Sequence, residues 1–249
     1  MDFKLQQEGE FSYIEEGEGK VLLLLHGLFG ALSNFEHLIN HFSKTHKVVI
    51  PMLPLYEYER ENTTVPAMKD FIYRFINHKK YDKVSLIGNS LGGHVALLFC
   101  LDYLDKVENL VLTGSSGLFE SAMGDTFPKR GSYEYIEKKT QDTFYDPKTA
   151  TKALVDEVFD IVNDRNKVIR VLALARSAIR QNVGEHLHKI IIPSLLIWGK
   201  EDQVTPAFVG EEFEKLLPQA KLHFIDKCGH APMMEHPATF NQILEQFLQ

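Results

Sequence analysis

One short segment of the chain has the residue types and spacing of a nucleophilic site. Residues 88–93 read Gly-Asn-Ser-Leu-Gly-Gly, which matches G-x-S-x-G and lies between an apolar strand-like run and an apolar helical run. In that context the serine sits on a sharp turn, and Gly88 and Gly92 leave the space that a Cβ atom would fill. Ser90 is therefore the candidate nucleophile. Because a serine hydroxyl is a poor nucleophile at neutral pH, it needs a base, and the base needs an orienting carboxylate.

Both partners occur downstream, on loops that follow strand-like segments. His230 comes just after the run 221–225 and is the candidate base. Asp202 comes just after the apolar run 194–198 and is the candidate acid, with the adjacent Glu201 as its rival. The carboxyl ends of parallel strands meet at one edge of a sheet, where functional groups gather. We therefore expect the serine, the histidine and the aspartate to lie together.

Other histidines compete for the role of base, and we interpret them as bystanders. His94 follows Ser90 on the same predicted helix, and His236 begins the predicted C-terminal helix. A histidine at such positions is more often a surface residue or a satisfied core residue than a catalyst. His26 ends a buried run, and we expect it to hold the turn that follows by hydrogen bonds.

A serine nucleophile also needs two backbone N–H groups that stabilise the oxyanion of a tetrahedral intermediate. One is expected from Leu91, the residue after the nucleophile. The other is expected from Leu28, in the turn His-Gly-Leu-Phe-Gly after the run 21–25. These two residues are the candidate oxyanion hole.

The elements that must position these residues alternate along the chain. Apolar or alternating runs predict strands at 11–15, 21–25, 47–50, 83–87, 107–112, 194–198 and 221–225. Apolar residues spaced three and four apart predict helices at 33–43, 65–75, 91–101, 208–217 and 236–248. Because parallel strands need helical crossovers, this alternation predicts an α/β fold with a mostly parallel sheet flanked by helices.

The strand signal stops between residues 118 and 188, where helices are predicted at 133–139, 150–162 and 165–179. We interpret this segment as a helical cap inserted into a core made of residues 1–117 and 189–249. Its apolar side chains suit a pocket wall, although each could equally pack inside the cap. They are Leu118, Phe119, Met123, Phe127, Tyr133, Tyr135, Phe144 and Tyr145.

Composition excludes several classes of protein. Apolar residues make up 44% and charged residues 24% of the 249 residues, close to the averages of globular proteins. The net charge of −7 and the absence of a basic run at either end argue against a nucleic acid partner. The longest apolar run, 95–101, is far short of a membrane span, which needs roughly 20 residues.

The same sequence gives no sign of a signal peptide, a metal or a cofactor. The first eight residues are polar and acidic, which predicts a cytoplasmic location. The two cysteines, Cys100 and Cys228, stand in apolar or strand-like segments and indicate reduced core thiols. The sequence contains no H-E-x-x-H, C-x-x-C, G-x-G-x-x-G or P-loop motif, so we expect neither a metal nor a cofactor.

Four ordered segments resemble the α/β-hydrolase superfamily over nearly the whole chain: the His-Gly turn, GNSLGG, WGKEDQVTP and CGHAPMMEHP. The chain is most similar to the capped branch, which includes small carboxylesterases and hydrolases that cleave carbon-carbon bonds in ring-fission products of aromatic compounds. The resemblance implies a triad of Ser90, His230 and Asp202. Asp202 fits the family pattern better than Glu201 does.

The resemblance leaves three functions open. Carbon-carbon hydrolases usually carry a tryptophan after the catalytic histidine, whereas this chain has Ala231, so a carboxylesterase acting on a small or medium ester is the first expectation. A carbon-carbon bond hydrolase is the alternative. A ligand receptor built on the same fold is a third reading, from another class. The sequence does not fix the substrate or the oligomeric state.

Overall fold

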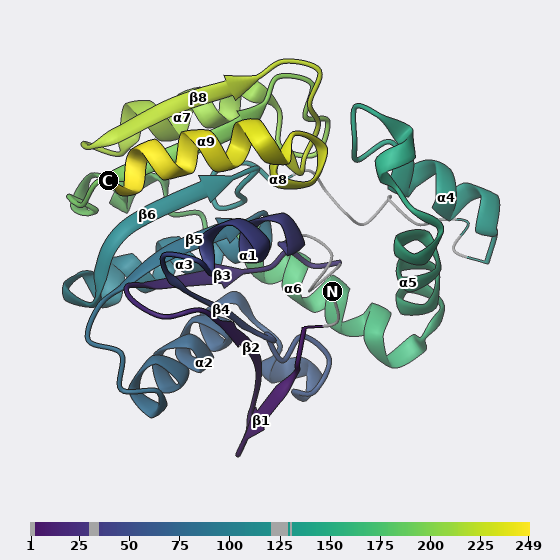
Figure 1. Cartoon of the computed structure of the whole chain (residues 1–249). Coiled ribbons are helices and arrows are strands. Elements are labelled where there is room, and N and C mark those ends of the chain that lie inside the picture. Colours follow the sequence, from purple (N-terminus) through teal and green to yellow (C-terminus); the bar gives the residue numbers. More distant parts are fainter. Residues whose placement is uncertain (1–2, 30–34, 121–128, 130) are drawn as a thin grey trace.

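The computed structural model describes residues 3–29, 35–120, 129 and 131–249 and is built around one eight-stranded sheet (Figure 1). The strand order is β1-β2-β4-β3-β5-β6-β7-β8. The pairs β1·β2 and β2·β4 are antiparallel, and the other five are parallel. The strands span Gln6–Glu8, Phe11–Glu16, Val21–Leu25, Lys47–Pro51, Val84–Asn89, Val107–Thr113, Ser194–Gly199 and Ala220–Ile225.

Helices cover both faces of the sheet. One face packs against α2 (Val65–His78), α3 (Leu91–Asp102) and α7 (Ala207–Leu216), which share one apolar cluster with the sheet. The other face packs against α1 (Glu36–Phe42), α8 (Pro232–Glu235) and α9 (Pro237–Leu248), within a second apolar cluster. The predicted α/β fold class is confirmed.

The described part of the segment 118–188 carries helices and no strand. It contains α4 (Tyr133–Gln141), α5 (Lys152–Asn163), α6 (Arg165–Arg180) and the 3₁₀ helix η5 (Gly184–Lys189). Figure 1 shows α4 and α5 set apart from the sheet, at the end of the molecule toward which the strand β6 points. The helix α6 runs back along the core, where it contacts α2. The boundaries of the predicted core and cap stay a prediction.

Candidate active site

Ser90 lies on a strained turn between β5 and α3, as the motif predicts. Its backbone has φ 54° and ψ −118°, in the region that residues other than glycine rarely adopt. The turn is held by hydrogen bonds from the Ser90 N–H to the Thr113 carbonyl (3.1 Å) and from the Ser116 N–H to the Ser90 carbonyl (3.2 Å). A Cβ atom on Gly92 would collide with the backbone of Leu25, so a glycine is required there. The turn presents the serine above the carboxyl end of β5.

His230 and Asp202 form a buried pair on the loops after β8 and β7. The Nδ1–H of His230 donates to Oδ2 of Asp202 at 2.9 Å, and the two residues are 7% and 2% exposed. The carboxylate also accepts hydrogen bonds from the Val204 N–H (2.8 Å), the Thr205 N–H (2.9 Å) and the Thr205 hydroxyl (2.8 Å). Burial by itself raises the pKa of Asp202, but the charge and hydrogen bond of His230, with the bonds from Thr205, hold this pKa below its usual value.

Glu201, the rival acid, points to a different partner. Its Oε2 accepts a hydrogen bond from the Cys228 N–H at 3.0 Å. The geometry therefore favours Asp202 as the residue that orients the imidazole of His230.

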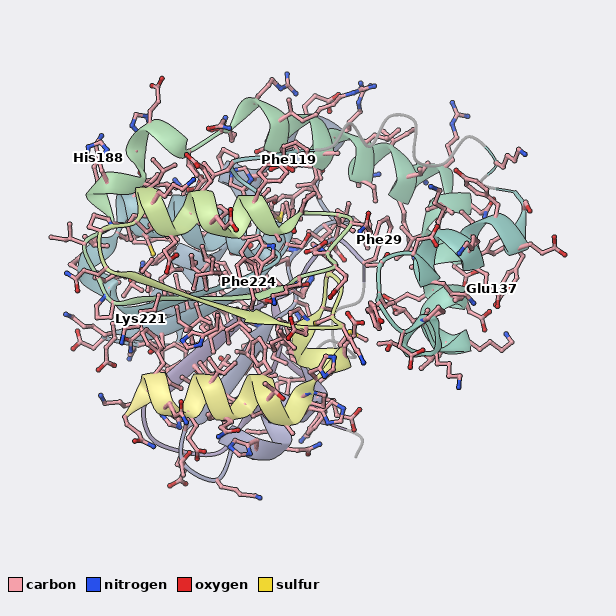
Figure 2. All side chains as sticks on the ribbon, turned by 90° about the horizontal axis from the view of Figure 1, so that it is seen from above. Phe29, Phe119, Glu137, His188, Lys221 and Phe224 are labelled. Carbon is pink, nitrogen blue, oxygen red and sulfur yellow. The ribbon has the colours of Figure 1, made fainter. Side chains whose placement is uncertain are left out.

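Ser90 and His230 line one cavity of about 380 Å³ between the carboxyl edge of the sheet and the helical segment. Within the described residues, no hydrogen bond joins the Ser90 hydroxyl to the imidazole. Such bonds are often long in unliganded sites and tighten when substrate binds. Phe29 lines the same cavity, and Figure 2 shows it between the core and the outlying helices that carry Glu137.

The two expected oxyanion donors stand beside the nucleophile. Leu91 is the first residue of α3, where a backbone N–H has no partner within its own helix. Leu28 lines the cavity, and its carbonyl accepts a hydrogen bond from the Tyr56 hydroxyl at 3.2 Å. His26 holds the turn, since its Nδ1–H donates to the Gly27 carbonyl (2.8 Å) and its Nε2 accepts from the Leu53 N–H (3.0 Å). Burial lowers the pKa of His26.

The other two histidines make structural contacts. The Nε2–H of His94 donates to the Gln181 carbonyl at 2.8 Å, and its buried Nδ1 has no hydrogen-bond partner among the described residues. Burial lowers the pKa of His94 to about 4. The Nε2–H of His236 donates to the Lys227 carbonyl at 2.8 Å. Neither residue lines the cavity in the part of the chain that the structure describes.

Comparison with known proteins places this chain in a family. A sequence model described as the alpha/beta hydrolase family matches residues 22–243, which is most of the chain. This chain belongs to the alpha/beta hydrolase family. Like the relatives it resembles, it is a hydrolase.

Two bacterial relatives and one solved structure are similar to this chain over most of its length. This hydrolase is 28% identical to a 2-hydroxy-6-oxononadienedioate/2-hydroxy-6-oxononatrienedioate hydrolase of Paraburkholderia phymatum, covering 95% of this chain and 90% of the relative. It is 27% identical to a 2-hydroxy-6-oxo-6-(2'-aminophenyl)hexa-2,4-dienoic acid hydrolase of Metapseudomonas resinovorans, covering 96% and 87%. The solved structure is an alpha/beta hydrolase enzyme from a sediment metagenome of the Mar Chica lagoon, Morocco. It is 44% identical, with a TM-score of 0.82 over 98% of this chain and 97% of that one.

The cavity wall that the segment 118–188 contributes in this alpha/beta hydrolase differs from the expectation. Of the eight cap residues expected to suit a pocket wall, Phe144 lines the cavity, and Met123 and Phe127 lie outside the described residues. The other five pack elsewhere or face solvent: Leu118 joins the core, Phe119 contacts Phe208, Tyr133 and Tyr135 pack within the cap side, and Tyr145 is exposed. The cavity is lined from the cap by Lys139, Thr140, Asp142, Thr143, Phe144, Leu154 and Val158.

The described residues contain no group of three or more His, Cys, Asp or Glu side chains that could hold a metal ion. None of the helices that the structure describes has the length and apolar character needed to cross a membrane.

Proposed function

We propose that Ser90, His230 and Asp202 form the catalytic triad of a hydrolase that cleaves a carbon-carbon bond next to a ketone. The observation that supports the triad is the buried His230–Asp202 hydrogen bond at the cavity that Ser90 also lines. The names of both curated relatives support the carbon-carbon substrate class, since each is a hydrolase of a 2-hydroxy-6-oxo acid. Carbon-carbon bond hydrolysis, the alternative expected from the sequence, is therefore ranked above ester hydrolysis, which was the first expectation.

The proposed chemistry begins with attack of Ser90 Oγ on the ketone carbon, while His230 Nε2 takes the hydroxyl proton. The N–H groups of Leu28 and Leu91 then stabilise the oxyanion. When the tetrahedral intermediate collapses, the bond from the former ketone carbon to the neighbouring carbon breaks. For a 2-hydroxy-6-oxo dienoate this step requires the 2-oxo tautomer, which forms when the proton of the 2-hydroxyl group moves to the carbon next to the ketone. The electron pair of the broken bond then moves into the conjugated 2-oxo acid chain, and His230 returns the proton to the leaving carbon.

Water completes the proposed cycle. His230 takes a proton from a water molecule that attacks the acyl-enzyme, and the second tetrahedral intermediate releases a carboxylic acid and regenerates the Ser90 hydroxyl. Asp202 stabilises the imidazolium that forms in each half-reaction. These steps differ from ester hydrolysis in the leaving atom, which is carbon instead of oxygen.

Ester hydrolysis is the second candidate, and the alanine at position 231 favours it. Ala231 lines the cavity beside His230, where the carbon-carbon hydrolases resembled by this chain usually carry a tryptophan. The smaller side chain leaves room beside the base. The same triad would then release an alcohol.

A direct comparison of substrates tests the proposal. The purified chain is given a synthetic 6-phenyl or 6-methyl 2-hydroxy-6-oxohexa-2,4-dienoate, whose absorbance is lost on cleavage, and p-nitrophenyl esters of two to eight acyl carbons. We expect a higher kcat/KM for a dienoate, and loss of turnover in a folded Ser90→Ala variant. Turnover of esters without cleavage of either dienoate would reject the carbon-carbon assignment in favour of the second candidate. A single burst without steady turnover of any substrate would favour a receptor.

A further inference from the structure

The loop of the candidate base and a turn of the cap segment contact each other directly. The His230 N–H donates to the Thr143 carbonyl at 3.0 Å. A Cβ atom on Gly229 would lie 2.7 Å from the Thr143 carbonyl oxygen and 2.8 Å from the Tyr145 nitrogen, which is closer than real Cβ atoms come. The backbones of the two segments therefore meet with no side chain between them.

Glu235, at the end of α8, bridges these two segments. One carboxylate oxygen, Oε1, accepts a hydrogen bond from the Gly229 N–H at 2.8 Å on the loop of the base. The other, Oε2, accepts from the Tyr145 N–H at 2.7 Å and from the Asp146 N–H at 3.4 Å on the cap turn. In Figure 1, α8 lies at the end of the core that faces α4 and α5. The side chain is half-buried, and three backbone N–H groups donate to its two carboxylate oxygens.

The bridged turn also forms part of the cavity wall. Thr143 and Phe144 line the cavity together with Ser90 and His230, and Phe144 is 8% exposed. The distance from this wall to His230 is set by the contacts that Glu235 and the His230 N–H make with the turn. A wall fixed in this way limits the size of the group that fits beside the base.

We propose that Glu235 is a positioning residue that holds the Thr143–Phe144 wall against the loop of His230 and so limits the size of the substrate group that fits beside His230. This inference rests on the proposed triad but not on the carbon-carbon substrate class. A carboxylate is suited to the task because it presents two acceptor oxygens and no donor. A glutamine amide at position 235 offers one acceptor oxygen. Its NH₂ group would face the N–H donors of either the base loop or the cap turn, and two donors cannot form a hydrogen bond with each other.

The test compares Glu235→Gln with Glu201→Gln as a matched control. Glu201 also accepts a hydrogen bond on the base loop, from the Cys228 N–H, but none of its hydrogen bonds with described residues reaches the cap turn. The readout is the rate at which Ser90 is modified by a methyl and by an octyl fluorophosphonate, because this reaction reports the size limit without a natural substrate. Hydrogen exchange of the Tyr145 and Gly229 amides is followed in the same samples.

We expect Glu235→Gln to change the ratio of the two labelling rates by about tenfold in favour of the octyl reagent, a size effect comparable to one methylene in a fitted pocket. The Tyr145 and Gly229 amides should exchange faster, and Glu201→Gln should keep the wild-type ratio. Glu235→Asp keeps the charge on a shorter side chain, and its ratio of labelling rates should lie between those of the wild type and Glu235→Gln. This variant also serves as a folded variant if Glu235→Gln unfolds.

An unchanged ratio in folded Glu235 variants whose amides exchange faster would overturn the proposal, since Glu235 would then hold the two segments together without limiting the size of the group that fits. An equal change of ratio in Glu201→Gln would also overturn it, because the effect would then come from the base loop alone. A chain that reacts with fluorophosphonates but cleaves no dienoate would reject the proposed substrate class and leave this test valid.

Discussion

Replacing Asp202 by asparagine is the sharpest test of the candidate site, because the structure shows which hydrogen bonds each orientation of the amide would keep and which it would lose. If the NH₂ group faces His230, the imidazole Nδ1 must accept a hydrogen bond, and its proton moves to Nε2. That tautomer has no lone pair for the Ser90 proton, so this orientation is inactive. If the amide is flipped, the NH₂ group faces the Val204 and Thr205 N–H groups, which now donate to the carboxylate at 2.8 and 2.9 Å.

The flipped and active orientation leaves the buried Thr205 N–H and the half-buried Val204 N–H without an acceptor, at about 1 to 3 kcal/mol each. The total of roughly 2 to 6 kcal/mol corresponds to a loss of roughly 30-fold to 10⁴-fold in kcat. The assay is steady-state turnover of the best substrate found, with circular dichroism to show that the variant is folded. Glu201→Gln should lose little activity. A folded Asp202→Asn variant within threefold of wild-type kcat, or a larger loss in Glu201→Gln, would refute this reasoning.

Three further predictions concern neighbouring groups. Thr205→Val removes a hydroxyl that donates to the Asp202 carboxylate and should lower kcat about tenfold, with recovery in Thr205→Ser; equal rates for both variants would contradict this. Lys139 supplies the positive charge of the described cavity lining, so Lys139→Met should raise KM about tenfold for a carboxylate-bearing dienoate but not for an uncharged ester, whereas Lys148→Met, at an exposed position outside the lining, should change neither. Burial raises the pKa of Glu120 to about 7, so the wild type should lose stability as pH rises from about 4.5 to 7. Glu120→Gln, whose amide stays uncharged and whose oxygen can still accept from the Gly117 N–H, should therefore raise the melting temperature at pH 8 and change it little at pH 4.5; no gain at pH 8 would count against this.

Most of the sheet could be predicted from the sequence because its strands are long apolar runs between turn residues. All seven predicted strands are confirmed, whereas β1, with three residues, and α8, with four, are too short to give a periodic signal. The helical periodicity of the segment 133–179 was also sufficient to predict helices. Short elements depend on the contacts around them more than on their own residues.

The candidate site was predictable only where residue type carries the information. Ser90, Asp202 and His230 belong to a recognisable order of motifs, and the structure brings Asp202 and His230 into hydrogen-bond contact. The cap wall was not predictable, because the helix face that meets the cavity depends on how the inserted segment packs against the core. Glu235 gave no signal either, since its partners are backbone N–H groups, which nearly every residue has.

The direction of α9 has a practical consequence for attaching the protein to a surface. This helix starts beside α8, at the end of the core that faces the helical segment, and runs to the C-terminal end of the chain at the opposite end of the sheet (Figure 1). A bead, electrode or sensor chip linked through the C-terminal residue, Gln249, would lie behind the sheet, with the cavity turned toward the solution. The chain can therefore be immobilised in one orientation, with the tether at the end of the sheet opposite the cavity.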